Sequence, residues 1–196
     1  MNNIDNNHLP ILARIGYWAS LLTIVFIVAH AFLYYPVIKA GVGPVEKFNV
    51  ESYAMTMIKN GIFTNGFLPQ AAAFIAGILC LATSACLYIY VPLKKKIFAL
   101  LSLSFGIISV TLGSMAYFAN WTCFPMSALA GDFSGLAQYA EGNINSFVFA
   151  MLILSFHIFT SFSIILLAPI FTLDKKNKFL GILFIIIGLS AVPSII

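Results

Sequence analysis

The sequence predicts an all-α polytopic transmembrane helix bundle, and three observations support this. Hydrophobic residues make up 61 % of the 196-residue chain, charged residues make up only 8 %, and the mean hydropathy is +1.01. A soluble domain carries about 25 % charged residues, so this chain cannot cover a surface that faces water. Long apolar runs alternate with the few charged residues. Together these features exclude a soluble enzyme, a secreted disulfide scaffold and a disordered tail.

Five apolar runs are long enough to cross a bilayer, because about 30 Å of hydrocarbon takes about 20 helical residues. The predicted spans cover residues 11–38, 68–93, 97–121, 144–171 and 179–196. The first is too long for a signal peptide, and bulky Tyr34, Tyr35 and Pro36 stand where small cleavage-site residues would be needed. Residues 1–196 are expected to form one integral membrane domain. Whether the natural chain continues into a sixth span is left open.

Basic residues are unevenly divided between the two predicted sides of the bundle. With the N-terminus inside, the inner side holds seven of the ten: Arg14, Lys94, Lys95, Lys96, Lys175, Lys176 and Lys178. Lys and Arg concentrate in cytoplasmic loops, so we expect an inner (plasma) membrane protein with a cytoplasmic N-terminus and an outside C-terminus. The lipid bilayer is the expected partner. The absence of a basic stripe argues against nucleic acid.

The two outer connections are long enough to hold short interfacial helices. Asn49 is a suitable N-cap for a helix that ends at Asn60-Gly61, with apolar residues on one face: Val50, Tyr53, Ala54, Met57 and Ile58. In the second connection, Ser134 is expected to cap a turn that carries Leu136, Tyr139 and Ala140 and ends at Gly142. Both helices are expected to lie at the outer interface or over the bundle.

Small residues in the second span predict close helix packing. Ala73 and Gly77 are four residues apart, a spacing that lets two backbones approach closely in lipid. The second span is therefore the expected central helix.

Charged groups are almost absent from the predicted spans, which narrows the possible chemistry. Only Arg14, at the edge of the first span, is charged, so proton or sodium coupling has no obvious carrier. Cys80 and Cys86 are about 9 Å apart along one helix and on different faces, so they cannot form a disulfide together. No catalytic residue is predicted.

The polar residues that remain in the bundle are the candidate ligand-binding residues: His30, Tyr34, Gln70, Tyr117, Asn120 and His157. The two histidines lie about 12 Å and about 20 Å below the outer border. Either each is a neutral imidazole bonded to a neighbouring helix, or the pair ligates a haem iron from both sides. The depth offset makes the haem arrangement awkward.

The leading functional hypothesis is therefore non-enzymatic and needs no cofactor. The chain is expected to bind an apolar or amphipathic ligand, such as a lipophilic small molecule, or to serve as an accessory subunit beside other membrane subunits. The first alternative is a redox subunit that holds haem b through His30 and His157. The second is an uncoupled carrier of a small neutral or lipophilic solute, with Gln70, Asn120 and Tyr117 at its outer mouth.

Overall fold

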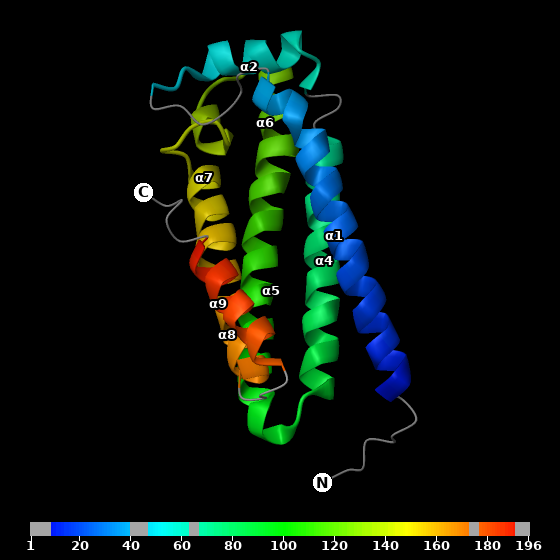
Figure 1. The fold of residues 1–196 in the computed structure, drawn as a ribbon. Coiled ribbons are helices and arrows are strands. Elements are labelled where there is room, and N and C mark those ends of the chain that lie inside the picture. Colours follow the sequence, from blue (N-terminus) through cyan, green and yellow to red (C-terminus); the bar gives the residue numbers. More distant parts are fainter. Residues whose placement is uncertain (1–8, 40–46, 63–66, 173–176, 191–196) are drawn as a thin grey trace.

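A computed structural model describes residues 9–39, 47–62, 67–172 and 177–190, and all regular secondary structure in these ranges is helical. The predicted all-α fold is therefore confirmed. Figure 1 shows the helices as a bundle with a short helix, α2, lying across one end. The elements are α1 (Leu9–Lys39), α2 (Val50–Lys59), α4 (Phe67–Tyr90), η2 (Leu93–Lys95), α5 (Lys96–Phe118), η3 (Ala119–Cys123), α6 (Phe124–Leu129), η4 (Leu136–Tyr139), α7 (Phe147–Leu152), η5 (Ile153–Phe159), α8 (Thr160–Thr172) and α9 (Lys178–Ser190).

The chain is a multi-pass membrane protein with four described helical stretches long and apolar enough to cross a bilayer. They are Leu9–Pro36, Leu68–Tyr90, Leu93–Leu129 and Phe147–Thr172, and they correspond to the first four predicted spans. The third continues beyond its predicted end because η3, a π-helical turn, leads directly into α6. Pro125 lies at the start of α6, where its ring fits the helical backbone but supplies no N–H to the helix.

The fifth predicted span begins as α9, whose 13 residues are about 20 Å long. That length is short of a bilayer core of about 30 Å. Residues 191–196, which completed this predicted span, lie outside the described residues. The fifth span therefore stays a prediction.

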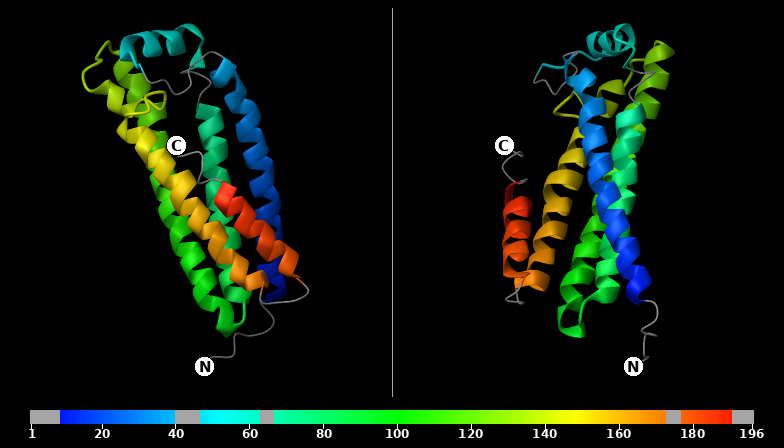
Figure 2. Two further views of the ribbon diagram at one scale, coloured as in Figure 1. Left: turned by 60° about the vertical axis from the view of Figure 1, so that its left-hand side comes forward. Right: turned by 45° about the vertical axis from the view of Figure 1, so that its right-hand side comes forward.

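Successive long helices pack side by side in a chain of pairs. Helix α1 packs against α4, α4 against α5, α5 against α8, and α8 against α9, and the two views of Figure 2 agree with this order. Helices α1 and α8 are not among the extensively packed pairs of the described residues. We call the end that carries Lys94, Lys95 and Lys96 the lysine end, and the opposite end the α2 end.

Serine hydroxyls join α5 to the helix that runs from η5 into α8. Ser155 Oγ donates to the backbone oxygen of Ser109 (2.8 Å), and Ser109 Oγ donates to that of Ser155 (3.0 Å). Nearer the lysine end, Ser163 Oγ donates to the backbone oxygen of Ser102 (2.8 Å). The paired serines are seven residues apart on α5 but eight apart on its partner. The π-helical turn η5 accommodates the extra residue, because its hydrogen bonds span five residues instead of four.

Glycines mark other close approaches between helices. A Cβ at Gly77 would lie 3.2 Å from Cγ2 of Val110, so α4 and α5 are in tight contact at the position predicted from the sequence. At Gly16, a Cβ would lie 3.2 Å from Cβ of Cys86, across the α1–α4 contact. In α9, a Cβ at Gly181 would meet Thr172, and one at Gly188 would meet Ile165, which explains how this short helix lies directly on α8.

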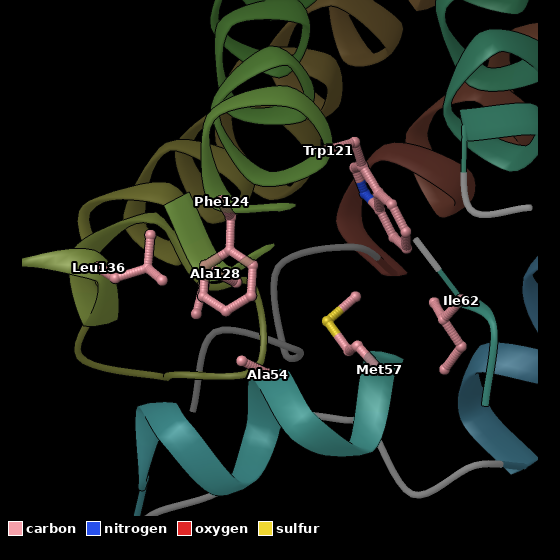
Figure 3. Close-up of a cluster of buried hydrophobic side chains, with 8 residues drawn as sticks. Ala54, Met57, Ile62, Trp121, Phe124, Ala128 and Leu136 are labelled. Carbon is pink, nitrogen blue, oxygen red and sulfur yellow. The ribbon is translucent and has the colours of Figure 1, made fainter. Parts of the chain in front are cut away.

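Helix α2 covers the α2 end through an apolar cluster (Figure 3). The Asn49 side chain accepts a hydrogen bond from the Ser52 N–H, so the predicted cap and helix are confirmed. Met57 of α2 is fully buried, as is Phe124 of α6, and both belong to a cluster with Ala54, Ile62, Trp121, Ala128, Leu136 and Ala140. Burying these side chains anchors a helix too short to be stable alone.

The predicted cap of the second loop is wrong. Gly135, with a positive φ of 67°, precedes η4, and the Ser134 side chain caps nothing there. Instead, the Ser134 N–H donates to Oδ1 of Asp132 (3.0 Å). A short aspartate turn thus takes precedence over a serine cap, since both residue types compete for the same backbone groups.

Replacing Gly77 with leucine should strongly destabilise the bundle, because the new side chain would have to displace Val110 from α5. Overpacking of this kind costs about 1–3 kcal/mol or more. Cys80→Ala, about one turn away at an exposed position of α4, is the control and should have little effect. Thermal unfolding in mild detergent measures both. A small loss of stability in Gly77→Leu together with a large loss in Cys80→Ala would contradict the packing described here.

Candidate ligand cavity

A cavity of about 420 Å³ lies between α1, α4, α5 and the η5–α8 helix. We call it the His30 cavity after the histidine in its wall. A second cavity of about 720 Å³, the Tyr90 cavity, continues toward the lysine end and is bordered by Phe171 and by Phe184 of α9. The two cavities adjoin, because they share four lining residues: Thr23, Cys80, Ser84 and Ile164. Helices α1 and α8 both line these cavities and are not among the extensively packed pairs of the described residues.

One face of α1 forms a wall of both cavities. Its lining residues recur every three or four positions, the spacing of one helix face: Leu12, Gly16, Ser20, Thr23, Ile27 and His30. Eighteen residues separate the first from the last, which corresponds to about 27 Å of helix. The adjoining cavities together are therefore elongated and nearly as long as a bilayer core is thick, about 30 Å.

The cavity walls are apolar although several of their residues have hydroxyl groups. Thr23, Ser84 and Ser114 each donate to a backbone oxygen four residues earlier in their own helices, at 2.8, 3.0 and 2.6 Å. Their hydroxyl hydrogens are thus already used. Among the described residues, no Asp, Glu, Lys or Arg lines either cavity. A charged ligand would find no counter-charge here.

Two polar groups at the α2 end of the His30 cavity have unused hydrogen-bonding capacity. His30 Nδ1 lies 2.8 Å from the backbone oxygen of Pro69, which can only accept, so Nδ1 carries the proton. In the neutral ring Nε2 is then an acceptor, and no described residue bonds to it. The Tyr117 ring lies against the Phe156 ring, with ring centroids 5.9 Å apart. The Tyr117 hydroxyl has no hydrogen-bond partner among the described residues. Both side chains line the same cavity.

A carboxylate from the second connecting loop organises the polar groups directly beyond this cavity. Glu141 accepts hydrogen bonds from the Tyr34 hydroxyl (2.8 Å), from Nδ2 of Asn120 (2.9 Å) and from the Trp121 side chain. Its own N–H donates to Oδ1 of Asn120 (3.0 Å). The Tyr34 ring stacks on His30, with ring centroids 5.6 Å apart. Glu141 therefore ties the loop to α1 and η3 at the mouth of the cavity.

Burial dominates the electrostatics of this carboxyl group. It raises the pKa of Glu141 above its ordinary value, and hydrogen bonds from Tyr34 and Trp121 oppose that rise without cancelling it. Tyr53 of α2 is next to the same group. Burial, and then the charge of Glu141, raise the pKa of Tyr53, so its phenol stays protonated at neutral pH. The Gly142 N–H bonds to this phenol, and any side chain at Gly142 would collide with the ring.

The structure brings four of the six candidate residues to one place. His30 and Tyr117 line the His30 cavity, and Tyr34 and Asn120 bind Glu141 beyond it. Gln70 is buried beside Pro69 and is not among the lining residues, and neither is His157 in η5. The cavity thus presents one histidine, not a facing pair. The sequence analysis did not include Glu141 or Trp121 among the candidate residues. Glu141 could have been noticed as an acid between the small residues Ala140 and Gly142.

The raised pKa of Glu141 predicts a pH-dependent stability. The folded chain keeps the proton of Glu141 to a higher pH than the unfolded chain, whose glutamate titrates near about 4.3. The free energy of unfolding should therefore fall as pH rises from that value through the folded pKa. Glu141→Gln should remove this component, and Asp132→Asn, at an exposed loop acid, should keep it. Melting curves from pH 4 to 8 measure the effect. A Glu141→Gln profile equal to that of the parent would contradict it.

Comparison of the chain with known protein families, with curated proteins and with solved structures finds no match. The case for a function therefore rests on the geometry of the cavities and on the polar groups at their α2 end.

Proposed function

We propose that this protein binds a lipophilic small molecule inside the bilayer, in the adjoining His30 and Tyr90 cavities. The observation that carries the proposal is a pair of adjoining, largely apolar cavities bounded by α1, α4, α5 and α8, with His30 and Tyr117 in the wall nearer the α2 end. Ligand sites are concave and mostly apolar, with a few polar groups that fix orientation. The cavities have this character.

The shape of the space favours an elongated ligand that enters from the lipid. Its α1 wall runs about 27 Å along the helix, and α1 and α8, which both line the space, are not among the extensively packed pairs of the described helices. A molecule dissolved in the bilayer could therefore reach the cavity sideways. No charged residue is among the described residues of the lining, which argues against coupled transport and supports simple binding.

Filling the junction of the two cavities tests the proposal. Ser84 lines both and bonds only to its own helix, so Ser84→Phe should occupy the junction, while Ser84→Ala should leave it open. The protein is released from membranes in mild detergent, and native mass spectrometry counts the small molecules that remain bound. We expect about one per chain in the parent and in Ser84→Ala, and at least a tenfold lower occupancy in Ser84→Phe.

The same bound complement in Ser84→Phe, or none in the parent, would overturn the proposal. Equal melting temperatures of the two variants in detergent serve as the control for folding.

We further propose that the lysine end faces the cytoplasm of the inner membrane and that the α2 end faces outward. The support is the distribution of basic residues. Seven of the ten, Arg14 and the lysines of two short turns among them, fall on the same predicted side of the membrane. On this orientation, the Glu141 network and α2 cover the outer end of the cavity.

Fusions to a reporter enzyme that is active only outside the cytoplasm test this orientation. Fusions after residues 60 and 130 should be active, and those after residues 95 and 176 should be inactive. Reporter activity in the fusion after residue 95 would show that the protein has the opposite orientation. A fusion after residue 196 should be active if the fifth predicted span crosses the membrane.

A further inference from the structure

We infer that the ligand is a long-chain or polycyclic alcohol whose hydroxyl group binds between His30 Nε2 and the Tyr117 hydroxyl. This inference rests on the proposed function and specifies the class of molecule. Its basis is the chemistry of two groups in the wall of the His30 cavity for which the described residues provide no hydrogen-bond partner.

The two groups have complementary requirements. With Nδ1 donating to Pro69, the neutral His30 ring offers an acceptor at Nε2. Tyr117 offers a hydroxyl that can donate. An alcohol meets both requirements at once, because its O–H donates to the imidazole while its oxygen accepts from the phenol. A ketone, ester or ether could serve only Tyr117 and would leave the His30 acceptor without a partner, which is costly away from water.

The Pro69 contact also determines which nitrogen of the His30 ring is available to a ligand. Pro69 is fully buried in the first turn of α4, so its backbone oxygen is a rigid partner for the ring. The stacked Tyr34 ring holds the other side of His30, and Glu141 holds the Tyr34 hydroxyl. The imidazole is therefore oriented before any ligand arrives, which lowers the cost of binding.

Charged head groups are disfavoured by the same surroundings. No described Lys or Arg lines the cavities, so a carboxylate or phosphate would be buried without a counter-charge. An ammonium group would need an acid in the lining, and the Glu141 oxygens already accept from Tyr34 and Asn120. A neutral hydroxyl is the head group that remains. With the head at the α2 end, the apolar part of the ligand lies along the α1 wall toward Tyr90.

A matched pair of probes tests the inference: a sixteen-carbon alcohol that carries a photoreactive diazirine in its chain, and the methyl ether of the same molecule. The full chain is reconstituted in phosphatidylcholine vesicles, and mass spectrometry locates and quantifies the labelled residues. The alcohol should label the cavity walls about tenfold more than the ether, since each net hydrogen bond contributes about 0.5–1.5 kcal/mol and a factor of ten is about 1.4 kcal/mol.

Variants of the histidine separate the two nitrogen positions. Asparagine places its amide N–H near Nδ1 and can keep the Pro69 contact, but it offers nothing at Nε2. Glutamine reaches the position of Nε2 and offers an acceptor there. The preference for the alcohol should disappear in His30→Asn and persist in His30→Gln. In protein with ¹⁵N-labelled histidine, hexadecan-1-ol should shift the His30 Nε2 resonance, and the ether should not.

The outcomes distinguish the inference from the proposed function. Equal labelling by alcohol and ether, abolished by Ser84→Phe, would overturn the hydroxyl assignment and leave the binding function standing. Labelling by neither probe above the Ser84→Phe level would overturn both. An alcohol preference that survives in His30→Asn, or that is lost in both histidine variants, would overturn the assignment of Nε2.

Discussion

The contact between α5 and α8 sets the spacing on which the rest of the bundle depends. Ser109 of α5 and Ser155 of η5, the turn that leads into α8, donate hydrogen bonds to each other's backbone oxygens, so α5 and the η5–α8 helix lie close at this level. Helix α5 also packs against α4, and it therefore joins the α1–α4 pair to the α8–α9 pair. Helix α1 packs on α4 and is not among the extensively packed partners of α8 in the described residues, and one face of α1 lines both cavities. The cavities follow directly from this arrangement.

Polar side chains are distributed differently along the helices and at the α2 end of the bundle. The long helices supply largely apolar walls, and the hydroxyl groups of Thr23, Ser84 and Ser114 bond to their own backbones. His30 and Tyr117 line the cavity toward the α2 end, and Glu141 lies beyond them, bonded to Tyr34 and Asn120. A hydrogen-bonded network around a buried carboxyl is rigid when every member has a partner. The Glu141 network thus fixes the loops and, through Tyr34, the orientation of His30.

The sequence predicted most of the helices because their signals are local. Long apolar runs located the first four spans, and Asn49 with an apolar face located α2. The π-helical turns at η3 and η5 were not predicted, because one extra residue in an apolar run leaves no mark on its composition. Glu141 was missed because its partners are distant in sequence: Tyr34 is 107 positions away and Asn120 is 21 positions away. The cavity could not be predicted for a related reason, since it depends on which helices pack extensively against each other and which do not.

The central claim is that the space between α1 and α8 is a ligand site, and a crystal structure of the full chain grown from a lipidic mesophase tests it most directly. The expected result is continuous elongated density along the α1 wall, from Thr23 to a head group beside His30 and Tyr117. A structure in which α1 packs directly on α8, with Thr23 in contact with Ile164 and no density between them, would contradict the account.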